Sequence, residues 1–335
     1  MLVNLVAVQA RMELADYRDH DAFSAKMAAL MSSVAKSVDG SLPTLVSFPE
    51  LIGMYLSFVP RYWADLKDER LLETTATRLV MQNITSVPEP CRVSPEAAAR
   101  YLLFVEGAAE TERAYIETFA GLAREYGWYV AAGSIALPPM EFEPSKGGRH
   151  AADASKVYNT AYLFSPKGVC LSRTPKVNMT PGLEERLFDG APASGVLPVD
   201  TAIGRVGTLV CFDGFHETLV ERMDAAGVSV LLKPSYNQHA WETTSSYDPV
   251  NTEGDTWLRT GCPSIIQGRE NVRFGVNAML VGGVFEDLYA EGRSSVAANT
   301  GDPEATWEDA VLAIATRPDA EEIVAATVEI PAGSS

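Results

Sequence analysis

A cysteine, a lysine and a glutamate in this chain have the chemistry of a nucleophilic site. Cys211 ends the apolar run 204–210, Glu50 follows the apolar run 43–48, and Lys176 lies between them in the sequence. A free thiol has a pKa near 8.5, so only a few per cent of it is thiolate at neutral pH. A carboxylate can accept the thiol proton during attack, and an ammonium group can stabilise the oxyanion that forms. The three residue types therefore indicate covalent acyl transfer through a cysteine.

Taken singly, each of these residues has a simpler interpretation. A cysteine at the end of a buried strand is more often a small core residue than a nucleophile, and glutamate and lysine side chains are usually solvated. His216 follows Cys211 closely enough to suggest a Cys–His pair, but it falls at a predicted helix start. A binding or assembly module without catalysis is a further alternative, although such a role would not need Cys211.

The chain must bring these side chains together through alternating strands and helices. Short apolar runs that stop at Gly, Pro or Asp are typical of buried strands, and such strands place chemistry at their carboxyl ends. The alternation predicts a layered α/β fold in a single domain, residues 1–335. The predicted helices are 20–37 and 98–126, and the predicted strands are 1–9, 43–48, 127–133, 204–210, 228–232, regions near 273–282 and 323–330, and a hairpin of 157–164 with 169–172.

Two segments lack a clean period. Residues 55–97 look like an insertion, and residues 236–257 are rich in Asn, Thr, Ser and aromatic side chains. Long aromatic loops often line a pocket or an oligomer contact, and ordinary surface excursions are an equal alternative.

Composition excludes several classes of function. The chain has 335 residues, 47% hydrophobic and 21% charged, with a formal net charge of −17. Such a surface repels phosphate backbones and anionic lipid, so neither nucleic acid nor a membrane is an expected partner. Four scattered cysteines support neither a disulfide framework nor a zinc site. The first residues read as a strand rather than a signal peptide, and no run reaches the roughly 18 apolar residues that span a bilayer, which predicts a cytoplasmic protein.

Joint motifs are more specific than the single residues. Phe48-Pro49-Glu50, then Lys176, then Cys211-Phe212-Asp213 before an apolar helix resembles the nitrilase superfamily of carbon–nitrogen hydrolases. The resemblance continues through Tyr158-Asn159-Thr160-Ala161 and Arg269-Glu270-Asn271, and it covers about residues 2–330. It implies a four-layer αββα sandwich, a Glu–Lys–Cys triad, no metal or organic cofactor, and a homodimer or larger homo-oligomer.

Carried over to this chain, the resemblance implies a role for each site residue. Glu50 would be the general base and Cys211 the nucleophile, while Lys176 and the backbone N–H of Phe212 would bind the oxyanion. The family also has a second glutamate that orients substrate. Glu184 is favoured by the aromatic Phe188 four residues on, and Glu185 is the alternative.

The resemblance further implies a substrate class. We expect hydrolysis of a small-molecule amide to an acid and ammonia through a Cys211 thioester. Asp213-Gly214 is similar to aliphatic amidases, and a Trp after the cysteine, which true nitrilases favour, is absent. His216 stands where a proline is common, and Arg269 directly precedes Glu270, whereas the family's arginine is usually three residues ahead. These departures concern the pocket, so an N-carbamoyl amino acid hydrolase or a nitrilase with the same triad stays open.

Overall fold

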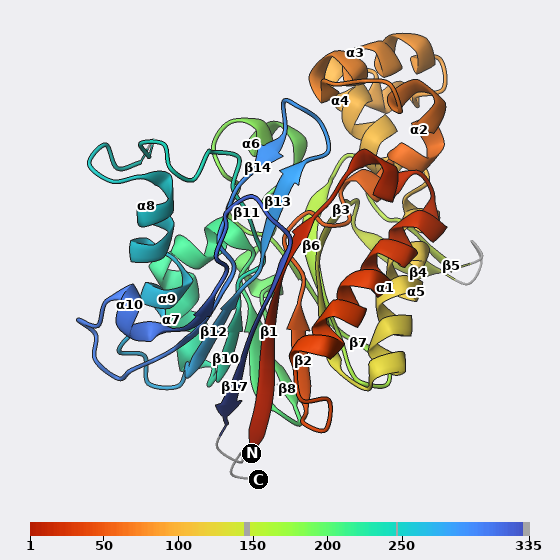
Figure 1. Ribbon diagram of the computed structural model, residues 1–335. Helices are drawn as coiled ribbons and strands as arrows, with labels where there is room; N and C mark the ends of the chain where they lie inside the picture. Colours follow the sequence, from red (N-terminus) through yellow and green to blue (C-terminus); the bar gives the residue numbers. More distant parts are fainter. Residues whose placement is uncertain (144–147, 246, 331–335) are drawn as a thin grey trace.

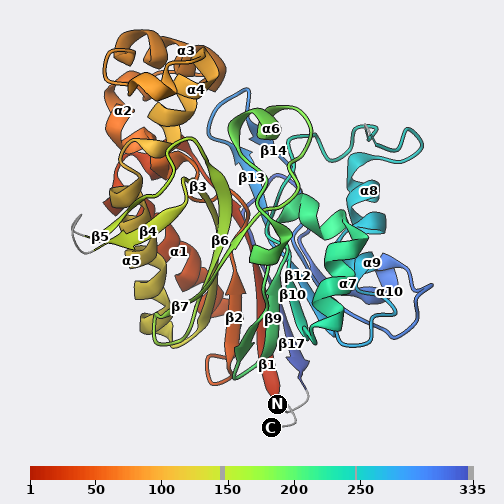
Figure 2. The same cartoon turned by 180° about the vertical axis from the view of Figure 1, so that it is seen from behind.

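Two β-sheets face each other and carry helices on their outer faces, which makes four layers (Figure 1; Figure 2 gives the view from behind). This computed structural model describes residues 1–143, 148–245 and 247–330. The first sheet runs in the order β11-β13-β1-β2-β3-β6-β7, with β14 paired to β13 and β17 paired to β1. The second runs β16-β15-β12-β10-β9-β8. The predicted four-layer αββα architecture is confirmed.

The strands of the two sheets have the following bounds. The first sheet contains β1 (Leu2–Arg11), β2 (Thr44–Ser47), β3 (Tyr129–Leu137), β6 (Tyr158–Phe164), β7 (Cys170–Pro175), β11 (Ser235–Tyr236), β13 (Met279–Gly283), β14 (Tyr289–Ala290) and β17 (Glu322–Glu329). The second contains β8 (Val199–Thr201), β9 (Gly204–Thr208), β10 (Val230–Leu232), β12 (Phe274–Asn277), β15 (Ser295–Ala298) and β16 (Val311–Ile314). A separate hairpin pairs β4 (Met140–Glu143) with β5 (Gly148–Ala151).

Strand β1 shows why both faces of the first sheet are buried. Val3, Leu5 and Ala7 belong to the core between the sheets, whereas Val6 and Val8 belong to the core beneath the outer helices. Successive side chains of a strand point to opposite faces, so the apolar run 5–8 buries both faces of the sheet.

Helices cover the two outer faces. On the first sheet lie α1 (His20–Ser37) and α5 (Ala108–Tyr126), which bring Phe23 and Phe119 into edge-on contact at a centroid distance of 6.1 Å. On the second lie α7 (Glu217–Ala225) and α9 (Cys262–Ile265). The remaining short helices are η1 (Leu14–Tyr17), α6 (Leu183–Leu187), η6 (Ala193–Gly195), η7 (Cys211–Phe215), α8 (Glu253–Thr260) and α10 (Trp307–Ala310).

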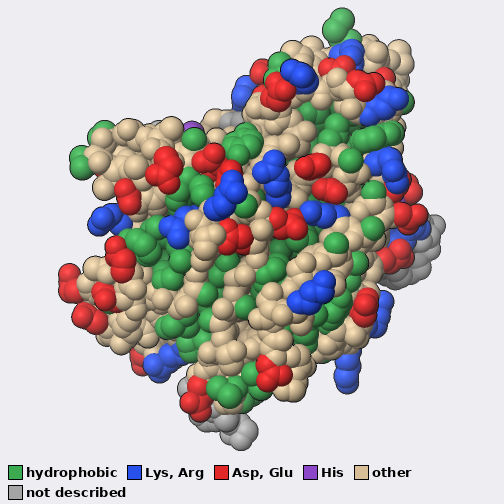
Figure 3. Space-filling view, in the orientation of Figure 1, with side chains coloured by type: hydrophobic (Ala, Val, Ile, Leu, Met, Phe, Trp, Pro, Cys, Tyr) green, Lys and Arg blue, Asp and Glu red, His purple; other side chains and the backbone are tan. Residues whose placement is uncertain are grey.

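Residues 55–97 form helices that rise above one end of the sheets (orange in Figure 1). They comprise η2 (Tyr55–Ser57), α2 (Val59–Leu66), α3 (Leu72–Asn83), η3 (Glu89–Cys91) and α4 (Pro95–Arg100). Val87 of this lobe forms a small core with Ala98 and Leu102, which follow it in α4 and in the next helical turn. In the space-filling view the lobe projects at the upper right, and acidic and basic side chains are interspersed over the visible face (Figure 3).

The predicted helix 98–126 is wrong as a single element. The chain forms α4, a π-helical turn η4 (Tyr101–Val105) and then α5, with a break at Gly107, whose φ is 73°. The left-handed φ of Gly107 cannot continue a right-handed helix, and glycine adopts this conformation without the steric cost that other residues pay. The region near 273–282 likewise forms two strands, because the chain passes from the second sheet to the first at Ala278. The other predicted elements differ only at their ends, where assignments usually vary.

None of the helices in the described parts of the chain combines the length and the apolar character needed to cross a membrane. Cys91, Cys170, Cys211 and Cys262 are all free thiols.

Candidate active site

The three residues singled out from the sequence meet at one end of the facing sheets. Glu50 follows β2, and Lys176 follows β7 of the same sheet, whereas Cys211 follows β9 of the opposite sheet. All three residues are buried: the exposed fraction is 2% for Glu50, 1% for Lys176 and 4% for Cys211. The site therefore lies between the two sheets, and neither sheet could form it alone.

A bulge in β3 positions Glu50. The pairing of β3 with β6 shifts register between Ala131 and Ser134, and Gly133 takes a φ of 70° there. Ser134 Oγ accepts a hydrogen bond from the Leu51 N–H at 2.8 Å. A Cβ at position 133 would lie 2.0 Å from the Pro49 carbonyl oxygen, so only glycine lets the strand approach the turn that carries Glu50.

The Glu50 carboxylate is held by two donors. Its Oε1 accepts from Asn159 Nδ2 at 2.8 Å and from Lys176 Nζ at 2.9 Å. Burial raises the pKa of Glu50, and the nearby Glu184 carboxylate adds to that effect, while the Lys176 ammonium opposes it. A carboxylate with a raised pKa is a stronger base, which suits proton transfer near neutral pH.

Lys176 lies between two carboxylates. Its Nζ donates to both oxygens of Glu184, at 2.6 and 2.7 Å, in addition to Glu50. Its backbone N–H donates to the Asn159 carbonyl at 2.8 Å. Burial alone would lower the pKa of Lys176, but the carboxylates of Glu50 and Glu184 outweigh it, so the pKa is raised and the side chain stays an ammonium ion.

The two candidate second glutamates lie in different surroundings. Glu184 also accepts the Thr180 N–H at 2.7 Å, and its carboxylate lines the same cavity as Cys211. Glu185 lies at the surface, where its Oε2 accepts the Gly182 N–H at 3.4 Å. Because α6 is a helix, consecutive residues point about 100° apart, so only one of the two can face Lys176.

Cys211 begins the tight turn η7 in a strained conformation. Its φ is 48°, its N–H donates to the Pro234 carbonyl at 2.9 Å, and its Sγ lies 3.6 Å from the Tyr236 carbonyl oxygen. Positive φ is uncommon for residues other than glycine and is concentrated at functional sites. Burial, followed by the charge of Glu50, raises the pKa of the thiol to about 12. The resting thiol is therefore neutral.

The turn after Cys211 also fixes the loop after Lys176. Asp213 accepts the Val177 N–H at 2.9 Å, and its Oδ1 accepts both the N–H and the side-chain amide of Asn178, at 2.7 and 2.9 Å. Phe212 is the second residue of η7, and the first N–H groups of a helical turn lack intrahelical partners. Asp213 thus connects the turn that begins at Cys211 to the loop that follows Lys176.

Two buried residues at the site were given no role from the sequence. Asn159 contacts Glu50, and its Tyr158-Asn159 motif was part of the resemblance. Lys233 is fully buried, and its Nζ lies 4.0 Å from the Phe215 ring centroid and 4.4 Å from that of Trp257. Burial lowers the pKa of Lys233. A lone lysine is usually exposed, so nothing local in the sequence marks it.

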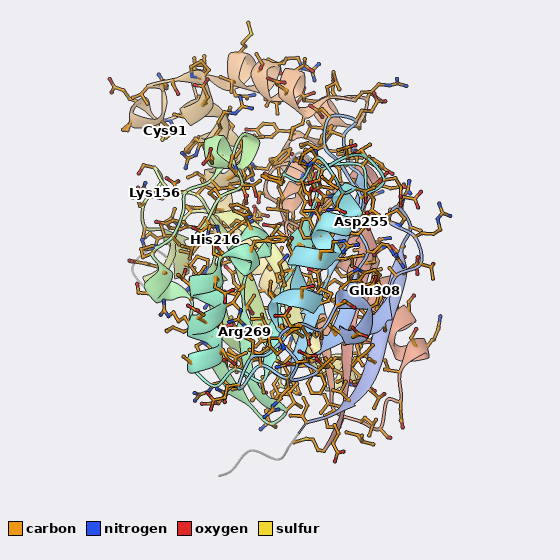
Figure 4. All side chains as sticks on the ribbon, turned by 90° about the vertical axis from the view of Figure 1, so that its left-hand side faces the viewer. Cys91, Lys156, His216, Asp255, Arg269 and Glu308 are labelled. Atoms are coloured by element: carbon orange, nitrogen blue, oxygen red, sulfur yellow. The ribbon has the colours of Figure 1, made fainter. Side chains whose placement is uncertain are left out.

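A cavity of about 590 Å³ opens above Cys211. Its walls come from η2, from the segment around α6, from residues 236–239 and 247–248, and from α8. Parts of the irregular segment 236–257, namely 236–239, 247–248 and the beginning of α8, therefore line the site, whereas of 55–97 only Tyr55 does. His216 lines a neighbouring pocket instead, and its ring packs edge-on against that of Phe212 with centroids 4.9 Å apart. Figure 4, seen from the side of α7 and α8, labels His216 at the start of α7.

Within residues 1–143, 148–245 and 247–330, no group of three or more His, Cys, Asp or Glu side chains is arranged to hold a metal ion.

Two curated relatives share part of the sequence. An apolipoprotein N-acyltransferase of Geobacter metallireducens is 27% identical over 221 residues, which are 58% of this chain and 39% of that protein. A nitrilase of Bradyrhizobium diazoefficiens is 24% identical over 176 residues, 52% of this chain and 49% of that protein. The matches thus span less than half the length of either relative.

Solved structures share the fold over nearly the whole chain. A carbon–nitrogen hydrolase from Helicobacter pylori G27 superposes with a TM-score of 0.62 at 15% identity, covering 98% of this chain and 90% of that one. An amidase from Nesterenkonia sp. AN1, in a mutant form with acrylamide added at its active-site cysteine, gives a TM-score of 0.56 at 17% identity and covers 99% and 94%. The carbon–nitrogen hydrolase family model matches residues 7–302. The chain therefore belongs to the carbon–nitrogen hydrolase family of the nitrilase superfamily.

Proposed function

We propose that this protein hydrolyses the carbon–nitrogen bond of a small-molecule amide to a carboxylic acid and ammonia. One observation carries the proposal: a buried cysteine, a buried carboxylate and a buried ammonium converge on one cavity, and Glu50 and Lys176 are directly hydrogen-bonded. Membership of the family supports a carbon–nitrogen hydrolase or a related enzyme. The absence of a Trp after Cys211 favours an amide over a nitrile.

In the acylation step Cys211 Sγ attacks the amide carbonyl carbon while Glu50 takes the thiol proton. The carbonyl π electrons move to oxygen, and the oxyanion is stabilised by Lys176 Nζ and the Phe212 N–H. Glu50 then gives its proton to the amide nitrogen, the C–N bond breaks, and ammonia leaves a thioester on Cys211. Glu184 orients the substrate by accepting a hydrogen bond from its NH₂ group.

In the deacylation step water replaces ammonia. Glu50 takes one proton from the water, whose oxygen attacks the thioester carbonyl and regenerates an oxyanion at the same donors. The C–S bond then breaks, the thiol recovers its proton from Glu50, and the carboxylic acid leaves. The balance is amide plus water giving acid plus ammonia, and the protein ends in its starting state.

The first test is ammonia release from aliphatic amides, ω-amides, N-carbamoyl amino acids and nitriles, with Cys211→Ala beside the wild type. We expect release from amides, and its loss in Cys211→Ala. Cys262→Ala is the matched control, because Cys262 is also a buried thiol whose pKa burial raises to about 12. Equal release from wild type and Cys211→Ala would exclude Cys211 as the nucleophile.

The same panel separates the alternatives that use this triad. Carbon dioxide released with ammonia would identify an N-carbamoyl substrate, and activity confined to nitriles would identify a nitrilase, as the name of one relative suggests. Acyl transfer from the thioester to an added amine would indicate a transferase, in keeping with the other relative's name. Each outcome leaves Cys211 essential and changes the substrate or the acceptor.

A further inference from the structure

The cavity above Cys211 is much larger than a simple amide requires. Its volume of about 590 Å³ lies within the range of roughly 300–1,000 Å³ found for pockets that bind drug-sized ligands. A water molecule occupies about 30 Å³ in the liquid, and acetamide has only four non-hydrogen atoms. An acetamide bound at Cys211 would therefore leave most of this cavity filled with water.

The cavity walls are largely apolar and aromatic. Met54 and Tyr55 contribute from one side, Phe188 from the segment after α6, and Phe215 and Trp257 from the side of η7 and α8. The last two rings pack edge-on with centroids 5.1 Å apart. When an apolar ligand group displaces water from such a surface, the binding free energy becomes more favourable.

The charges on the walls disfavour an anionic ligand. Lys176 is the only lysine or arginine among the described residues that line the cavity, and two carboxylates already hold it. Asp248 and Glu253 lie in the wall as well, and Glu253 Oε1 accepts the Trp257 indole N–H at 3.0 Å. A carboxylate on the acyl group would meet acidic side chains and no free cation.

We infer that the acyl group of the substrate is bulky, hydrophobic or aromatic, and without negative charge, as in an arylalkyl amide. This inference rests on the proposed amide hydrolysis and narrows it, because it excludes both short aliphatic amides and N-carbamoyl amino acids as the preferred substrates. Residues 237–239, Tyr247, Asp248 and α8 set the selectivity, since they line the cavity and take no part in the proposed proton transfers.

Hydrolysis of matched amides by the wild-type protein is the first measurement. Buried methylene groups contribute about fourfold each, and a buried phenyl ring about tenfold to a hundredfold. We expect kcat/KM to rise from acetamide through hexanamide to 3-phenylpropanamide by at least tenfold, and to fall at least tenfold when that ring carries a para-carboxylate. A kcat/KM for acetamide, or for the para-carboxylate derivative, that equals or exceeds that for 3-phenylpropanamide would overturn the inference.

Binding to Cys211→Ala separates this inference from the proposed function. Calorimetry should show that 3-phenylpropanamide binds more tightly than acetamide and more tightly than its para-carboxylate derivative. If the wild type hydrolyses no amide, the proposed function fails, and this order of affinities alone then upholds or overturns the inference about the pocket.

A cavity-filling variant tests the location of the subsite. Thr256 lines the cavity on α8, so Thr256→Trp should lower the ratio of kcat/KM for 3-phenylpropanamide to that for acetamide at least tenfold. Thr260→Trp, one turn further on, serves if the first variant does not fold. Arg259 on the same helix is exposed, and Arg259→Trp should leave the ratio unchanged. An unchanged ratio in a folded Thr256→Trp or Thr260→Trp protein would refute the assignment.

Discussion

Replacing Glu50 by glutamine should abolish turnover and yet make the Cys211 thiol more acidic. Burial raises the pKa of the Cys211 thiol, and the charge of the Glu50 carboxylate raises it further. A nearby negative charge disfavours thiolate, so its removal must lower the pKa. The same substitution removes the proposed general base, and a general base contributes about 10²- to 10⁴-fold to the rate.

The size of the shift follows from Coulomb's law. Two unit charges about 5 Å apart, at an effective dielectric constant of about 20, interact by about 3 kcal/mol, or about two pKa units. From a value of about 12, the pKa of Cys211 should therefore fall to about 10. At pH 7.5 the thiolate fraction, and with it the rate of modification by a thiolate-specific reagent, should rise by about 100-fold.

Modification by methyl methanethiosulfonate between pH 6 and 11 measures this effect. Mass spectrometry of the Cys211 peptide separates that thiol from Cys91 and Cys170, which are only partly buried. Glu185→Gln is the matched control, since Glu185 lies at the surface and its charge should barely affect the thiol. A slower reaction or a higher pKa in Glu50→Gln would refute the electrostatic argument, whatever the effect on turnover.

Three further perturbations test the structural basis of the site. Gly133→Ala should lower the unfolding free energy in urea by about 1–3 kcal/mol and reduce kcat, because the new Cβ would meet the Pro49 carbonyl and the backbone φ is positive. Gly121→Ala is the control: it has open space around it and should not lower the unfolding free energy. Burial raises the pKa of Cys262 to about 12, against an ordinary value of 9.0, so its contribution to stability is lost as the pH rises through this window. With Cys262→Ala, the fall in unfolding free energy between pH 9 and 11 should be shallower by up to about 1.4 kcal/mol per pH unit. Lys233→Met should leave the unfolding free energy unchanged or higher, because it removes a buried ammonium group. The same substitution should raise the pKa of Cys211 in the modification assay, and a lower pKa would contradict this expectation.

Local patterns in the sequence were enough to predict the strands that precede Glu50 and Cys211, and the resemblance joined these residues with Lys176 as candidates. Apolar runs ending in Phe48-Pro49-Glu50 and at Cys211 are strand signals that depend only on near neighbours, and the resemblance carried by the same motifs supplied the four-layer fold. Elements whose limits depend on distant contacts were predicted less well. The left-handed Gly107 separates α5 from the turns before it, and the change of sheet at Ala278 divides what reads as one apolar run.

The sequence alone determined which residue types were available for acyl transfer and where along the chain they stand. Only the tertiary structure decided that Glu184 rather than Glu185 contacts Lys176, that Asn159 holds Glu50, and that Lys233 is buried between aromatic rings. It also decided the size and charge of the cavity, which combines walls from segments far apart in the chain. The physical reason is that strand and helix signals are local, whereas burial, pKa and pocket shape depend on which distant segments pack together.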